Sequence, residues 1–167
     1  MPTDFSQLTT SQVAALNSDE IIALTTAEVQ VIGAEQVMAL STGQIRLLTT
    51  DTTSALTNTF VSSLTTSQLS GLDTTQVSVL SASQLSSFTE PQVVALSSDQ
   101  FLGMSTTQIS GFGNAQIAAI EPGDLNAMGS GAVLALSVSQ IGALLTSAVV
   151  GLGSSQIAAL DAAQLSG

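Results

Sequence analysis

An eight-residue repeat runs through the chain without an insertion and restricts what the chain can fold into. Written as positions 1 to 8, the unit reads L-[S/T]-[T/S]-x-Q-[V/I]-x-[A/G], and Leu64–Gly71 is a clear copy. Twenty units follow one another from Leu8 to Gly167; position 1 is apolar in all of them, and position 6 in all but one, which has Thr53. A fixed short period without slippage predicts a solenoid, in which each unit buries its apolar residues against neighbouring units.

The polar positions of the repeat indicate a helix in each unit. Position 2 is mostly Ser or Thr, and position 5, three residues later, is Gln in thirteen units and Glu in two. This spacing is that of a capping box, in which the hydroxyl accepts from the backbone at position 5 and the Gln or Glu side chain accepts from the backbone at position 2. Position 6 and the next position 1 are three residues apart, so they fall on one helical face.

Proline and small residues occupy positions that fit the same interpretation. Pro2 and Pro122 fall at position 3 and Pro91 at position 4, the first two residues of the expected helix, where an N–H has no partner within the helix. Position 8 is Ala, Gly or Ser in seventeen of the twenty units, as close packing of neighbouring turns requires.

We therefore predict an all-α solenoid of very short helices, one per repeat, with a β-solenoid as the alternative. The pattern leaves open whether two or three helices complete a coil. Residues 1–167 form a single domain of about 21 units in this interpretation. The repeat weakens near residues 52–61 and 124–135, where Gln is lost and softer coils are expected.

Composition excludes several classes of function. The net charge is −11 and Arg46 is the only basic residue, so the chain cannot neutralise phosphates, and neither nucleic acid nor an anionic membrane surface is expected as a partner. The uncharged stretch 131–152 is long enough to span a bilayer, but the repeat continues through it and a membrane span is not favoured.

Candidate catalytic and metal-binding residues are few. There is no Cys or His, and the nearest carboxylate couples are Asp19–Glu20 and Glu121/Asp124, which solvated positions at helix starts explain. Four acids share position 4, but two to six units separate them; they are Asp19, Glu35, Asp51 and Asp99. No catalytic residue, metal site or cofactor is predicted, and the chain is not expected to be an enzyme.

The two termini suggest self-association. Residues 1–7 fit positions 2 to 8 of a further unit, and Gly167 falls on position 8, so neither terminus carries an additional polar helix to close the stack. Open solenoid ends predict a head-to-tail homopolymer in which one subunit continues the spiral of the last. The predicted subunit-contact residues are Phe5, Leu8, Ile157, Leu160 and Leu165.

The string L-T-T-x-Q-V-x-A-L, as in residues 8–24, resembles octapeptide arrays of large, acidic, repeat-rich bacterial surface and secreted proteins. The resemblance extends over essentially the whole chain and implies an extracellular or cell-surface scaffold without residue-level activity. The segment Met1–Phe5 lacks the basic and apolar parts of a classical signal peptide, so export is expected by another route.

Three functional hypotheses follow. The first is a structural subunit that stacks head-to-tail into an extracellular filament, such as a biofilm matrix component. The second is a monomeric spacer or binding module of a bacterial adhesin or secreted protein. The third is an ice-binding solenoid, suggested by Thr pairs at positions 2 and 3 such as Thr9–Thr10 and Thr65–Thr66.

Overall fold

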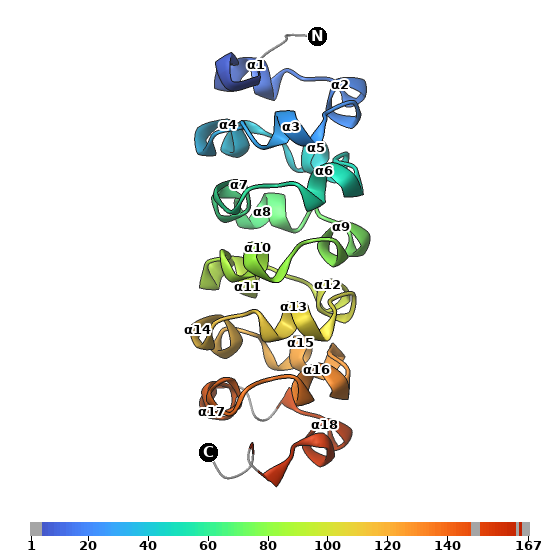
Figure 1. The fold of residues 1–167 in the computed structure, drawn as a ribbon, viewed down its shortest axis with the longest axis vertical. Helices are drawn as coiled ribbons and strands as arrows, with labels where there is room; N and C mark the ends of the chain where they lie inside the picture. Colours follow the sequence, from blue (N-terminus) through green and yellow to red (C-terminus); the bar gives the residue numbers. More distant parts are fainter. Residues whose placement is uncertain (1–4, 148–150, 163, 165–167) are drawn as a thin grey trace.

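A computed structural model describes residues 5–147, 151–162 and 164, with residues 145–147 described by their backbone alone. Every regular element in this part of the chain is a short helix (Figure 1). The elements are η1 Phe5–Gln7, α1 Thr10–Ala14, α2 Ser18–Ile22, α3 Thr26–Val29, α4 Ala34–Ala39, α5 Thr42–Arg46, α6 Thr50–Ser54, α7 Asn58–Ser63, α8 Thr66–Leu69, α9 Thr74–Ser78, α10 Ala82–Ser86, α11 Glu90–Val94, α12 Ser98–Leu102, α13 Thr106–Ser110, α14 Asn114–Ala118, α15 Pro122–Ala127, α16 Ser130–Leu134, α17 Val138–Ser147 and α18 Ser154–Ala159.

Each helix begins at the predicted cap. At the start of α8, the Thr65 hydroxyl accepts from the backbone N–H of Gln68 at 3.2 Å, and the Gln68 Oε1 accepts from the backbone N–H of Thr65 at 2.8 Å. Two extended residues at positions 1 and 2 turn the chain between helices; Leu40 has φ −67° and ψ 138°, and Ser41 has φ −74° and ψ 157°. The prediction of one helix per repeat is confirmed from α1 to α16, and most of these helices carry the predicted side-chain cap; α4, α14, α15 and α16 begin without one.

Three helices complete one coil, which the sequence left open. Helices that lie three repeat units apart pack on one another in a column that runs along the stack (Figure 1). One column contains α1, α4, α7, α10, α13, α16 and α18; a second contains α5, α8, α11, α14 and α17; the third contains η1, α3, α6, α9, α12 and α15. The solenoid is all-α, and the alternative of a β-solenoid is wrong for the described residues.

The core is the continuous row of side chains from positions 1 and 6. Leu85 and Ile109 at position 6 are fully buried, and Leu80 at position 1 is 3% exposed. The polar exception at position 6, Thr53, is also buried, and its hydroxyl donates to the carbonyl of Thr49 at 2.8 Å. A coil of 24 residues thus contributes about six core side chains and buries them only against its neighbours.

Position 8 meets position 3 of the coil before it. A Cβ added at Gly71 would lie 2.5 Å from the Thr42 Cγ2, and one at Gly103 would lie 2.3 Å from the Thr74 Cγ2. The small residues at position 8 therefore permit close approach of adjacent coils, as the sequence indicated.

One helix extends across the boundary between two eight-residue units. Helix α17 runs ten residues and passes through Leu144, a position 1 at which other units turn. The following position 2 is Leu145, which has no hydroxyl to accept from a helix N–H. A helix start at this position would therefore lack the side-chain cap that most other helices of the rod have.

The two weakened stretches keep their helices. Helices α6 and α7 span the first, and α15 and α16 the second. At position 5 these four units carry Thr52, Phe60, Asp124 and Ala132, and all four side chains are buried. The softness expected at 52–61 and 124–135 stays a prediction.

Truncation of the core should destabilise the rod, while truncation of its surface should not. Leu85→Ala removes a fully buried side chain at position 6 and should cost about 2–5 kcal/mol of unfolding free energy. Leu102→Ala, at a side chain that is 65% exposed, should change it by less than about 0.5 kcal/mol. Chemical denaturation followed by circular dichroism measures both, and equal effects would contradict the assignment of the core.

Candidate functional site: the glutamine ladder and its grooves

The glutamine at position 5 forms hydrogen bonds through both ends of its amide. The Gln92 Oε1 accepts from the backbone N–H of Thr89 at 2.7 Å, which starts its own helix. The Gln92 Nε2 donates to the carbonyls of Val61 at 3.0 Å and Leu64 at 2.7 Å, which belong to the preceding coil. One side chain therefore closes a helix start and binds the corner one coil away.

This arrangement repeats along the rod, and we call it the glutamine ladder. In every rung the Nε2 donates to the position 1 carbonyl 28 residues earlier. It also donates to a carbonyl 30 or 31 residues earlier. All these side chains are at most 9% exposed. The ladder glutamines are Gln36, Gln44, Gln68, Gln76, Gln84, Gln92, Gln100, Gln108, Gln116, Gln140, Gln156 and Gln164.

The ladder satisfies backbone groups that short helices leave without partners. A helix leaves its last carbonyls unpaired, and a solenoid of five-residue helices has many such ends. The amide donors bind these carbonyls inside the coil interface, where an unpaired carbonyl would cost about 1–3 kcal/mol. Among the described residues, no buried side-chain nitrogen or oxygen atom lacks a hydrogen-bond partner.

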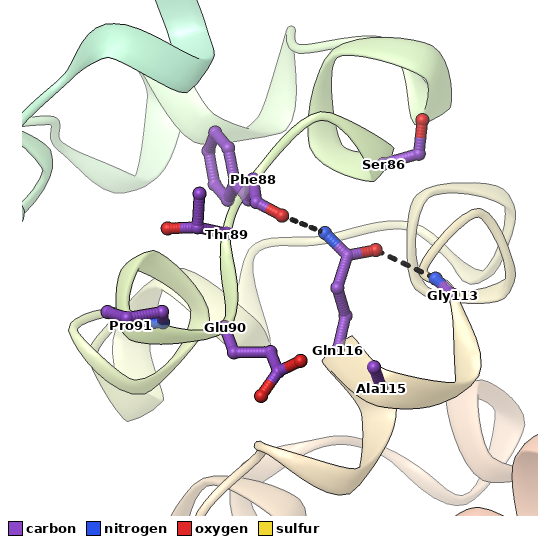
Figure 2. A pocket seen from close by; sticks show the side chains of 8 residues that line it. All are labelled: Ser86, Phe88, Thr89, Glu90, Pro91, Gly113, Ala115 and Gln116. Carbon is purple, nitrogen blue, oxygen red and sulfur yellow. Dashed lines mark hydrogen bonds between the residues drawn. The ribbon is translucent and has the colours of Figure 1, made fainter.

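A shallow groove opens on the surface beside a rung, as Figure 2 shows for Gln116. In that view Gln116 joins the carbonyl of Phe88 to the backbone N–H of Gly113, with both distances 2.7 Å. The Glu90 carboxylate lies across the groove from Ala115.

Equivalent grooves lie beside other rungs. One follows Gln36 and is lined by Thr9, Gly33 and Glu35, and another follows Gln44 and is lined by Asn17 and Ser41. Their volumes are ≈ 470 and ≈ 510 Å³, against ≈ 500 Å³ for the groove beside Gln116. These grooves are a consequence of the coil geometry, and a carboxylate lines two of them, Glu90 in one and Glu35 in the other.

Most carboxylates of the described residues lie apart from one another at helix starts. Asp19 and Glu20 lie in the first turn of α2, as expected. Glu121 is the residue before α15, but the solvated position expected for Asp124 is wrong: its side chain is 8% exposed, and it accepts from the Ser98 hydroxyl at 2.6 Å. The reason is that Asp124 occupies position 5, which faces the preceding coil.

The acids at position 4 do not line one face. With three helices per coil, Glu35 lies in the column of α1, while Asp51 and Asp99 lie in the column of η1, two coils apart. No group of three or more acidic side chains that could hold a metal ion occurs among the described residues.

The structure places four of the five predicted subunit-contact residues. Phe5 is 1% exposed, Leu8 packs partly buried against the core, Ile157 is 47% exposed and Leu160 is 9% exposed. Leu165 lies outside the described residues. The carbonyls of Phe5 and Leu8 accept from the Gln36 Nε2 at 3.1 and 2.6 Å, so at this end the acceptors serve the first rung within the chain.

Sequence reasoning identified the acceptor role of glutamine and missed its donor role. A capping box accepts Glu as readily as Gln, because only an oxygen acceptor is required. Thirteen Gln against two Glu at position 5 therefore indicated that the second amide atom, an N–H donor, also has a partner.

No described helix combines the length and apolar character that crossing a membrane requires. The uncharged stretch 131–152 instead contains parts of α16 and α17 and the buried Gln140.

Fold and ladder together define a repeat protein of the α-solenoid kind. The family model for the ALTTAQ repeat matches residues 117–152, which is less than a quarter of the chain and supports a repeat family. The matched stretch runs from within α14 to the residue before Gly153 and includes Asp124 and Ala132, two positions without a ladder glutamine. No curated protein matches the chain.

Replacing one ladder amide by a carboxylate should separate the two roles of glutamine. Gln92→Glu retains an acceptor for Thr89 and loses the donor to Val61 and Leu64, so a carboxylate would face two carbonyls. We expect a loss of about 2–4 kcal/mol in unfolding free energy. Gln12→Glu is the matched control, because Gln12 also accepts from its cap residue but is exposed, and it should be nearly neutral. Comparable losses in the two variants, measured by urea denaturation, would refute the donor role.

Proposed function

We propose that the protein is a non-enzymatic structural rod that acts as a spacer or binding module in a larger surface or secreted assembly. The observation that supports this most directly is the glutamine ladder, which fastens each coil to the coil before it. Because both ends of each amide are held in a buried interface, bending the rod would break hydrogen bonds as well as open the core.

The sides of the rod suit a spacer. Exposed positions carry mainly Ser, Thr and small residues, and twelve carboxylates against one arginine give the rod a net charge of −11. A net charge of this size keeps like rods apart and disfavours lateral aggregation. The large apolar side chains that remain exposed, such as Ile22, Met38, Val94 and Leu102, belong to different helices.

An extracellular or cell-surface location belongs to the same proposal. It is supported by the resemblance to octapeptide arrays of acidic surface proteins. Antibodies against the chain should label intact source cells or their medium. Labelling only after the cells are permeabilised would contradict this location.

Head-to-tail stacking into a filament is the second candidate, and one observation favours it. Gln12 has an amide at position 5 that makes no contact with an earlier coil among the described residues, and Leu152 stands at position 1 near the other end of those residues. A second copy in the same spiral would bring Gln12 to the carbonyl of Leu152, by the 28-residue spacing of the other rungs.

The ice-binding hypothesis now rests on the Thr at position 3. The hydroxyls of Thr9, Thr25 and Thr65 are used as helix caps, so only the Thr at position 3 remains. Thr26, Thr50 and Thr74 occupy this position in α3, α6 and α9, which pack on one another in one column, whereas Thr66 lies in α8 of another column. A short series of position 3 threonines therefore follows one column, and the hypothesis stays a prediction that a thermal hysteresis assay would test.

Small-angle X-ray scattering tests whether the protein is an elongated monomer in solution. At neutral pH, small-angle scattering of the purified chain should give a single cross-section and a maximum dimension that do not change with concentration. The ladder variant Gln92→Glu should show a greater spread of maximum dimension with an unchanged mass. A compact particle for the unaltered chain, or a length that grows with concentration, would contradict the monomeric rod.

A further inference from the structure

The glutamine ladder runs without a break in one of the three columns of helices. In the column that contains α5, α8, α11, α14 and α17, each helix has a position 5 glutamine that donates to the position 1 carbonyl of the preceding coil. Another such glutamine follows 24 residues after the one in α17. We call this column the spine, and its rungs are Gln44, Gln68, Gln92, Gln116, Gln140 and Gln164.

The other two columns are interrupted. From Gln36 onward, four position 5 residues in the described part of the chain supply no amide donor to the preceding coil. Phe60 and Ala132 have no polar side-chain atom, and the Thr52 hydroxyl donates to a carbonyl at the start of its own helix at 3.0 Å. Asp124 accepts from a serine hydroxyl of the preceding coil at 2.6 Å, and an ionised carboxylate has no proton to donate to a carbonyl.

These four residues form two pairs that interrupt the ladder in the same way. Thr52 and Phe60 lie in the consecutive helices α6 and α7, and Asp124 and Ala132 lie in α15 and α16. Each pair removes two of the three rungs that join one coil to the coil before it, and the third rung belongs to the spine. We call the two coil interfaces the first joint, which keeps the rung of Gln68, and the second joint, which keeps that of Gln140.

The ladder is complete between the joints. Seven consecutive units there carry a position 5 glutamine that donates to the position 1 carbonyl 28 residues earlier. This stretch therefore has the same fold and the same type of core as the joints but three rungs in each coil. The rungs are Gln68, Gln76, Gln84, Gln92, Gln100, Gln108 and Gln116.

A bend in the rod separates two neighbouring coils on the side that opens. At a complete rung such as Gln84, opening removes a hydrogen bond of 2.6 Å to the Leu56 carbonyl and leaves that buried carbonyl without its amide donor. At Phe60 and Ala132 only the packing of apolar atoms resists the same movement, and each atomic contact contributes little to it.

We infer that the rod has two built-in hinges, one at each joint, and that each hinge opens on the two columns without a rung while the spine remains closed. The spine rung fixes one edge of the interface, so the movement is a bend about the spine and not a separation of the coils. Hinges at these places would let a spacer change the angle between the parts that it separates. The inference rests on the hydrogen bonds between coils, and it holds or fails independently of the proposed role as a spacer.

Distances between pairs of spin labels measure such bending in the full chain. The sequence contains no cysteine, so labels attach only where one is introduced. Position 7 is exposed at five residues of the column of α4, α7, α10, α13 and α18, and labels two coils apart there are separated by about 20 Å. Met38→Cys with Ser86→Cys spans the first joint, and Ser110→Cys with Ala158→Cys spans the second. Ser62→Cys with Ser110→Cys is the matched control, because it spans two interfaces with complete rungs.

Double electron–electron resonance on the three labelled pairs gives the width of each distance distribution. We expect the widths for both joints to exceed that of the control by at least about 1.5-fold, because local opening is easier where fewer bonds close the interface. Ile22→Cys with Ser70→Cys spans the first joint along the spine, where Gln44 and Gln68 supply both rungs, and should be as narrow as the control.

A hinge should also be transferable. Gln100→Thr with Gln108→Ala removes the same two columns' rungs from one coil of the complete stretch and keeps the spine rung of Gln116. In this background the Ser62/Ser110 label pair should broaden to the width found at the joints. Circular dichroism checks that the variant remains folded. If it does not, Gln108→Ala alone is the variant to measure, since it removes the rung that lies between those two labels.

Three results would overturn the inference: equal widths for the joints and the control, a spine pair as broad as the pairs across the joints, or a folded rung variant with an unchanged width. The first means that the rungs do not limit bending, and the second means that bending is not directed by the spine. Each of these results leaves the spacer proposal intact, because a uniformly stiff or uniformly soft rod still separates what is attached to it.

Discussion

A side-chain amide that is hydrogen-bonded at both of its ends is the interaction on which this solenoid depends. Helices of five residues are not stable in isolation, because few of their backbone groups find partners within the helix. Glutamine supplies an acceptor to the start of its own helix and donors to the corner of the preceding coil, as Gln68 does with Thr65 and Leu40. The apolar core at positions 1 and 6 drives the coils together, and the ladder determines how they align.

Local chemistry in the sequence was sufficient to predict the helices, their caps and their core, because each of these features lies within one eight-residue unit. The number of helices in a coil was not predictable in this way, because it depends on how much the chain turns at each corner. The donor contacts of Gln92 reach 28 and 31 residues back and were missed for the same reason. The preference for Gln over Glu at position 5 was the feature of the sequence that indicated these donor contacts. Asp124 was misjudged because an acid near a helix start is usually solvated, whereas position 5 here faces another coil.

Departures from the repeat have local structural consequences that follow the same rules. Leu145 lacks a capping hydroxyl, and α17 continues where a corner would otherwise form. Phe60 and Thr52 replace ladder residues and are buried in the coil interface without a donor to the preceding coil. Glu20 and Glu28 preserve the cap of α2 and α3 and lack the amide donor. A unit can therefore lose either its capping residue or its amide donor while the solenoid is kept. This is consistent with a scaffold whose function depends on shape and length.

Hydrogen exchange of the glutamine side-chain amides, followed by NMR, tests the ladder most directly, because it observes the donors themselves. The account predicts that the Nε2 protons of buried glutamines such as Gln68, Gln92 and Gln108 exchange at least about 100-fold more slowly than those of the exposed Gln12. Uniformly fast exchange of all glutamine side chains in the folded protein would contradict the ladder, and the solenoid would then have to be held by its apolar core alone.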